Sequence, residues 1–176
     1  MALEVLNPQQ ILTQSGTDDP LDYVRLGVAA AREEHFERGL IFLAEAYRRL
    51  SRSPDAHIPP SALSYYGLCL ALHKGRVKEA AEYCQLAIER EFYNAEHYAN
   101  LGRVWAVGRS RRKAVDALDR GLAMDPRNAM LQQLRAEFGV RNHPVLPFLH
   151  RDNPLNVTLG RVRQTIKKKP AARKKR

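Results

Sequence analysis

Histidine and cysteine, the side chains that most often bind metals or attack substrates, are scattered along this sequence. No two histidines stand at HxxxH or HExxH spacing, which would place two imidazoles on one helix face to bind zinc. We therefore expect surface or packing roles for the six histidines, which are His35, His57, His73, His97, His143 and His150.

The two cysteines, Cys69 and Cys84, form neither a CxxC motif nor a disulfide framework. A buried free cysteine behaves as a small apolar side chain, which is the role we expect here, with a redox role as the alternative. The sequence also has no GxSxG, GxxxxGK[ST] or GxGxxG motif. We therefore expect no enzymatic activity, no metal site and no cofactor.

The composition suits one compact domain or a short helical array. The chain has 176 residues, of which 44% are hydrophobic, enough to build a core. No apolar run approaches the ~20 residues that a membrane-spanning helix needs. The N-terminus lacks the basic start and apolar stretch of a signal peptide. These features predict a soluble, cytoplasmic protein.

Positive charge is concentrated at the C-terminal end. The net charge is +10, and nine Lys or Arg residues but no Asp or Glu follow from Arg161 onward. The first 160 residues carry 20 basic and 19 acidic side chains and are nearly neutral. We expect a disordered basic tail over residues 167–176, whose cations are Lys167, Lys168, Lys169, Arg173, Lys174, Lys175 and Arg176.

This tail has two interpretations. It is either a solvated extension or a segment that binds the phosphates of nucleic acid or an acidic membrane surface. The last twenty-five residues contain no aromatic side chain, so stacking on single-stranded bases is not indicated.

A pattern of small, aromatic and leucine residues recurs three times. Its clearest copy lies in residues 95–128 and consists of Tyr98, Leu101, Gly102, Trp105, Ala114, Leu118, Gly121 and Pro126. The upstream copies keep the same spacing through Tyr23, Leu26, Gly27, Ala30, Gly39, Leu43 and Ala46, and through Leu63, Tyr66, Gly67, Leu70, Ala80, Cys84 and Ala87. The middle copy has one extra residue in its internal turn.

The pattern resembles the tetratricopeptide repeat (TPR), a unit of two antiparallel helices about 34 residues long. The resemblance implies an all-α fold, a right-handed α-solenoid of three helix hairpins and a C-terminal capping helix. We expect the array over residues 20–141, with repeats at about 20–53, 60–94 and 95–128 and the capping helix at 129–139. In this capping helix, Leu131, Leu134 and Phe138 share one face. Gly139 stands where a glycine commonly ends a helix.

The regions outside the repeats carry weaker signals. Residues 1–19 read as a loose N-terminal extension, after which Asp19 and Pro20 predict a helix start. Residues 142–166 read as an irregular segment that ends in a short amphipathic helix, with the apolar residues Leu155, Leu159, Val162 and Ile166.

The glycines of the repeat are predicted to be packing residues. Gly27, Gly67 and Gly102 should face small residues of the second helix, so that the two axes approach closely. The predicted packing set is Gly27, Gly67, Gly102, Gly39, Ala80, Ala114, Trp105 and Pro126.

The resemblance also implies a concave groove, lined by the first helices, that binds an extended peptide or a partner helix. The predicted groove residues are Val24, Arg25, Val28, Tyr65, Leu68, Leu72, Asn100, Arg103 and Val107. Most of them would form an apolar strip, with Arg25, Asn100 and Arg103 as hydrogen-bonding groups. Family members that bind a C-terminal carboxylate use Lys, Asn and Arg at five positions, where this chain has Val24, Val28, Tyr65, Glu96 and Asn100. Such a ligand is therefore not expected.

The function predicted from these features is a non-catalytic adaptor or scaffold that binds another protein. One alternative is a secretion-chaperone-like protein that holds an extended segment of its partner. Another is a nucleic-acid-associated protein anchored by the basic tail. The groove could also be filled in cis, by residues 1–19 or by residues 155–166.

Overall fold

The computed structural model describes residues 8–14, 16, 18–52, 57–139 and 158–159. It divides into two units, residues 1–138 and residues 139–176. In the second unit only Gly139, Thr158 and Leu159 are described, so the amphipathic helix and the basic tail predicted there lie outside the described residues, apart from the helical residues 158–159.

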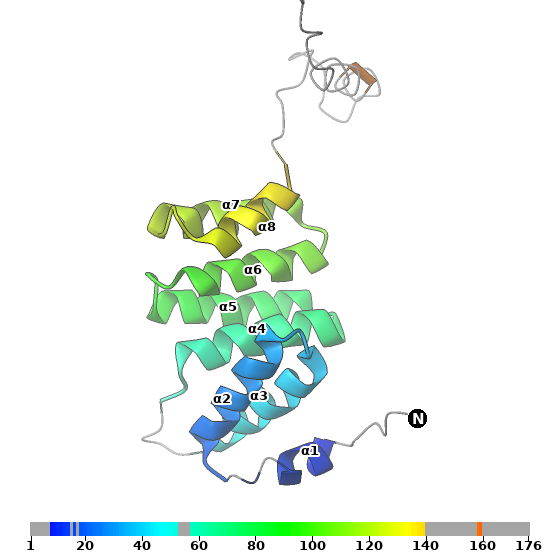
Figure 1. Ribbon diagram of the computed structural model, residues 1–176, viewed down its shortest axis with the longest axis vertical. Helices are drawn as coiled ribbons and strands as arrows, with labels where there is room; N and C mark the ends of the chain where they lie inside the picture. The colour runs from blue at the N-terminus through cyan, green and yellow to red at the C-terminus, as the bar shows by residue number, and fades with distance from the viewer. Residues whose placement is uncertain (1–7, 15, 17, 53–56, 140–157, 160–176) are drawn as a thin grey trace, which may run out of the picture. The chain divides into compact units, whose positions relative to one another are not determined.

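The first unit is built of helices packed in chain order (Figure 1). They are α1 (Pro8–Gln14), α2 (Pro20–Arg32), α3 (Phe36–Leu50), α4 (Pro60–Lys74), α5 (Val77–Arg90), α6 (Ala95–Val107), α7 (Arg111–Met124) and α8 (Ala129–Glu137). Among the described residues there is no strand. The pairs α2/α3, α4/α5 and α6/α7 pack as hairpins, and α8 packs on α6 and α7. The predicted all-α repeat array is confirmed.

Polar caps fix several helix starts. The carboxylate of Asp19 accepts a hydrogen bond from the backbone N–H of Leu21 at 2.8 Å, and Pro20 is the first helical residue, as predicted. Asn94 and Asn128 cap α6 and α8 in the same manner. These caps satisfy backbone donors that the helices themselves leave unpaired.

The three repeat glycines lie where the helices of each hairpin touch. A Cβ atom added to Gly27 would lie 2.5 Å from Cγ of Leu43 and 3.2 Å from the carbonyl oxygen of Gly39. One on Gly67 would lie 2.5 Å from the carbonyl oxygen of Ala80. A Cβ atom on Gly102 would lie 2.7 Å from Cδ2 of Leu118. The first and third hairpins thus differ from our expectation, because the atoms nearest to their glycines belong to Leu43 and Leu118 rather than to the small residues of the second helix.

Two other predicted packing residues have different surroundings. Trp105 is half-buried, and the ammonium of Lys113 lies 4.1 Å from its ring centroid. Pro126 is exposed in the turn between α7 and α8, where its carbonyl accepts a hydrogen bond from Gln132 at 2.8 Å. Pro126, which the sequence placed in the packing set, is thus exposed to solvent.

The interior holds one large apolar cluster, drawn from α2 to α7, and a smaller one under α8. Leu131 of α8 is fully buried in the smaller cluster, so α8 caps the last hairpin as predicted. Tyrosines join the first two hairpins: the Tyr66 ring lies 6.0 Å from that of Tyr47 and 4.9 Å from that of Tyr83.

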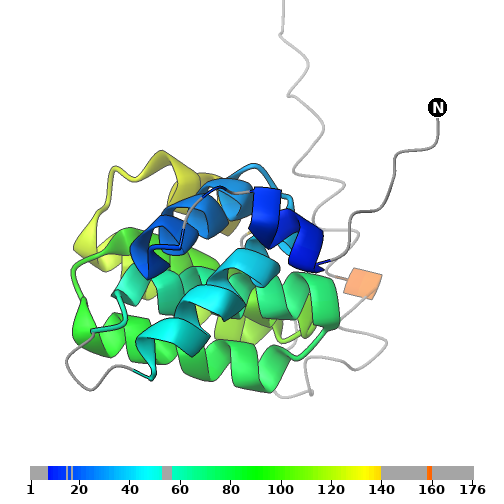
Figure 2. The same cartoon turned by 90° about the horizontal axis from the view of Figure 1, so that it is seen from below.

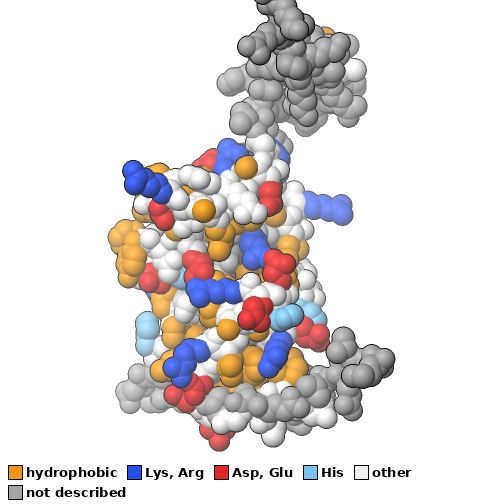
Figure 3. All heavy atoms as spheres, in the orientation of Figure 1, with side chains coloured by type: hydrophobic (Ala, Val, Ile, Leu, Met, Phe, Trp, Pro, Cys, Tyr) orange, Lys and Arg blue, Asp and Glu red, His pale blue; other side chains and the backbone are white. Residues whose placement is uncertain are grey.

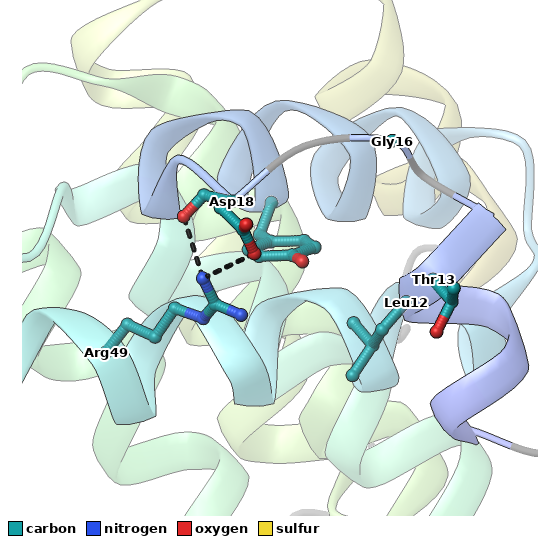
Figure 4. A pocket seen from close by; sticks show the side chains of 6 residues that line it. Leu12, Thr13, Gly16, Asp18 and Arg49 are labelled. Carbon is teal, nitrogen blue, oxygen red and sulfur yellow. Dashed lines mark hydrogen bonds and ion pairs between the residues drawn. The ribbon is translucent and has the colours of Figure 1, made fainter.

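Residues 8–14 are more ordered than the sequence suggested. Instead of a loose segment, residues 8–14 form α1, which among the described helices contacts only α3 (Figures 1 and 2). Arg49 of α3 anchors the connection that follows, since its guanidinium donates to the carbonyl oxygen of Asp18 at 2.7 Å and lies 4.9 Å from the ring centroid of Tyr23 (Figure 4). Residues 8–14 therefore do not fill the predicted groove.

Candidate partner-binding face

The first helices of the hairpins, α2, α4 and α6, form the face on which the groove residues were predicted, here called the inner face. Neighbouring first helices pack directly on one another, α2 on α4 and α4 on α6. The structure separates the nine predicted residues into a buried group, a partly exposed group around one cavity, and two further residues of α2.

Four of the predicted groove residues are buried rather than exposed. The exposed fractions are 6% for Val24, 2% for Tyr65, 0% for Leu68 and 2% for Asn100. Asn100 donates its side-chain N–H to the hydroxyl of buried Ser64 at 3.0 Å, which pairs α6 with α4. The predicted apolar strip is therefore largely interior, and these residues join the helices to one another.

The other two groove residues of α2, Val28 and Arg25, are also less available than expected. Val28 is partly buried against the large core cluster. Arg25 is exposed, and its guanidinium forms an ion pair with Asp22 of the same helix. The first hairpin thus offers few free groups on this face.

A polar bridge crosses all three first helices. Arg32 of α2 donates to the hydroxyl of Tyr65 at 2.9 Å and to the carboxylate of Glu96 at 2.9 Å. The Tyr65 hydroxyl in turn donates to Glu96. Burial and the hydrogen bond to Glu96 raise the pKa of Tyr65 to about 12, so the phenol stays protonated and remains a donor.

A second bridge runs from the turn of the first hairpin to α6. The guanidinium of Arg103 donates to the carboxylate of Glu34 at 3.2 Å, and it lies 5.5 Å from the ring centroid of Phe36. Together the two bridges bring residues 32–36 against α6, which helps to explain why the inner face is closed along this half. Neither Glu34 nor Phe36 was identified from the sequence, because both lie outside the repeat pattern.

The open part of the inner face is a cavity of about 210 Å³ between α4, α6 and α8. Three predicted groove residues line it: Leu72, Arg103 and Val107. The opposite wall comes from α8, through Leu134 and Phe138. From the sequence, Leu134 and Phe138 were predicted only as apolar residues on one face of a capping helix. In the structure each is partly buried, and its exposed part lines the cavity.

The walls of this cavity combine apolar surface with one cation, Arg103, and one carboxylate, Glu137. Val107 is 38% exposed, and the ion pair of Arg103 is with Glu34, whose side chain is 73% exposed. Such exposed ion pairs are weak, so Arg103 can exchange Glu34 for another carboxylate. The site suits an apolar side chain.

The described histidines and cysteines are mostly packing or paired residues. No group of three or more His, Cys, Asp or Glu residues among them could hold a metal ion. His97 is fully buried and pairs with Glu91 at 2.9 Å, and this hydrogen bond lowers the pKa of the Glu91 carboxyl. Burial raises the thiol pKa of both Cys69 and Cys84 to about 12, which disfavours the reactive thiolate.

Two further cavities, each of about 360 Å³, lie near α1 and contain none of the predicted groove residues. One lies at the α1–α2 connection beside Leu12 and Arg49 (Figure 4), and the other lies between α1, α3 and the end of α4.

On the face seen in Figure 3, Lys and Arg side chains are interspersed with Asp and Glu. No helix among the described residues is long and apolar enough to cross a membrane.

No protein-family model and no curated sequence matches the chain. Solved structures do match it in fold. The TPR domain of Arabidopsis OM64 aligns with a TM-score of 0.54 and 14% identity, over 68% of this chain and 93% of that domain.

Two further TPR proteins align over much of the chain. TTC0263, a thermophilic TPR protein of Thermus thermophilus, has a TM-score of 0.55 and 19% identity, over 68% of this chain and 64% of its own. YrrB, described as a TPR protein with an unusual peptide-binding site, has a TM-score of 0.54 and 20% identity, over 72% of this chain and 62% of its own. The present chain thus spans less than two thirds of each of these two proteins. The first unit of the chain is a helical repeat array with the tetratricopeptide-repeat fold.

Proposed function

We propose that the protein is a non-catalytic interaction module that binds a peptide or an amphipathic helix of a partner protein on its inner face. The observation that carries this proposal is the cavity between α4, α6 and α8, where Leu72, Val107 and Phe138 surround a space large enough for an apolar side chain. Peptide-recognition grooves commonly use such a pocket to anchor one residue of the ligand.

The repeat fold also supports this proposal, independently of the cavity. Stacked solenoid repeats create an extended surface, and repeat proteins commonly bind their partners on it. YrrB, which shares this fold, is described as having a peptide-binding site. In the present chain, the buried Tyr65 and Leu68 leave only the C-terminal half of the inner face available for such a ligand.

The test is a comparison of two surface variants in affinity purification with mass spectrometry. Val107→Lys places a charge at the cavity, and Leu86→Lys makes the same kind of change at an exposed leucine of α5. A partner that binds the cavity should be recovered with the wild type and with Leu86→Lys but be lost with Val107→Lys. Equal recovery with both variants would exclude the cavity as the binding site.

A further inference from the structure

The turns inside the second and third hairpins form an edge rich in exposed cations. The α4–α5 and α6–α7 turns lie at the same side of the array (right in Figure 1). They also touch, because a Cβ atom on Gly108 would lie 2.7 Å from Cγ1 of Val77. We call this surface the basic edge, and its exposed cations are Lys74, Arg76, Lys78, Arg109, Arg112 and Lys113.

Most of this charge is not neutralised by the neighbouring residues. Within residues 57–139, Arg76 pairs with Glu79 at 2.5 Å, but Lys74, Lys78, Arg109 and Arg112 take part in no ion pair. Lys113 lies over the ring of Trp105 instead of against a carboxylate. The edge therefore presents a net positive surface to solvent.

Two helix N-termini add to the positive potential of the basic edge. Both α5 and α7 begin here, and neither Arg76 nor Ser110, the residues at their N-cap positions, caps the helix with its side chain. The first turn of α7 contains no acidic residue. Helix N-termini carry partial positive charge and are normally stabilised by anions. Cations at these positions repel the helix dipole, and a bound anion would relieve that repulsion.

We propose that the basic edge binds the phosphate backbone of double-stranded nucleic acid. Arginine presents several N–H donors in a fork that matches a phosphate, and Lys, Arg and helix N-termini supply the usual contacts to a duplex backbone.

The surroundings of the edge favour a duplex over the other polyanions. Membrane-surface binding normally uses exposed apolar side chains beside the cations. The exposed Phe92, Tyr93 and Met124 lie near the opposite ends of α5 and α7, and of the exposed large apolar side chains that the structure describes, Val107 at the end of α6 adjoins the edge. Single-stranded bases would need a free aromatic face, but the ring of Trp105 already carries Lys113.

The test uses the full-length protein and a fluorescent DNA duplex of about 20 base pairs, with binding measured between about 50 and 200 mM salt. The wild type should bind with a salt slope of about −5 or steeper, since six edge cations contribute about −0.9 each. The double variant Arg109→Gln/Arg112→Gln should bind more weakly, with a slope shallower by about 2.

The matched control is Arg52→Gln/Arg127→Gln, which removes the same charge from exposed arginines outside the basic edge. It should keep the wild-type slope, and circular dichroism should show both variants folded. An equal loss with both variants would assign binding to general charge and overturn the proposal, as would a wild type that does not bind. Tighter binding to phosphatidylserine vesicles than to the duplex would also overturn it.

Discussion

The hydroxyl of Tyr65 donates a hydrogen bond to the carboxylate of Glu96, so a residue in the middle of α4 is tied to the first turn of α6. Arg32 of α2 donates to the same two groups and lies 5.6 Å from the Tyr65 ring centroid. One buried phenol thereby connects all three hairpins. These contacts stabilise the stacking of the repeats, in addition to the apolar contacts within each pair.

We predict that Tyr65→Phe lowers the free energy of unfolding by about 1–2 kcal/mol, because it removes a hydrogen bond to a charged group. Urea denaturation would measure this change. A double-mutant cycle with Glu96→Gln separates the bridge from other effects of the two substitutions. If the two changes were additive, the Tyr65–Glu96 contact would contribute nothing to stability.

The repeat glycines should differ in their tolerance of a methyl group. Gly67→Ala would push Cβ to within 2.5 Å of a backbone oxygen, that of Ala80, whereas Gly102→Ala would meet the Leu118 side chain at 2.7 Å. A side chain can rotate away but a helix backbone cannot. We therefore expect Gly67→Ala to cost more than Gly102→Ala, within the range of about 1–3 kcal/mol typical of overpacking. Thermal or urea unfolding would rank the two, and a reversed order would contradict the explanation.

Much of the fold follows from short-range patterns that the sequence displays directly. Gly27, Gly67 and Gly102 mark one position in three helix pairs, and Asp19 before Pro20 marks a helix start. Each depends on residues in the same hairpin or the same helix turn. Such signals persist whatever the angle between hairpins, which is why the hairpins and the capping helix could be predicted.

The inner face could not be predicted in the same manner. Whether Tyr65 and Leu68 are exposed depends on how the first hairpin sits against α6, and that is set by contacts such as Arg32–Glu96, between residues 64 positions apart. A long segment between α3 and α4 also separates this hairpin from the regular repeat spacing. The family pattern gives the positions that face the groove, but it does not tell whether another part of the chain covers them.

A pH-dependent contribution to stability should come from Glu45 of α3. Its carboxylate accepts hydrogen bonds from Arg48 at 2.5 Å and Arg49 at 2.6 Å, which lower its pKa from 4.5 to about 2. Because the carboxyl pKa is lower in the folded state than in the unfolded state, the ionised carboxylate stabilises the fold at pH values above about 4.5. This contribution disappears as the pH falls from about 4.5 towards 2.

The corresponding variant is Glu45→Gln, which should lower the free energy of unfolding by up to about 1 kcal/mol at pH 7, the range of surface ion pairs. The difference from wild type should shrink below pH 4.5, as followed by urea denaturation at several pH values. Glu82→Gln is the control, since it removes an exposed carboxylate that forms no ion pair within the described helices. A difference that stayed constant with pH would argue against the ion pairs as its source.

The two cysteines should report opening of the array. Cys69 and Cys84 are fully buried, and burial raises their thiol pKa to about 12, so little thiolate is present or accessible at about pH 8. We predict that a thiol-reactive dye labels neither residue in the native protein and labels both in denaturant. Because Cys69 and Cys84 lie in the same hairpin, they should become reactive together as urea is added. Labelling of one cysteine well before the other would show that α4 and α5 separate before the array unfolds as a whole.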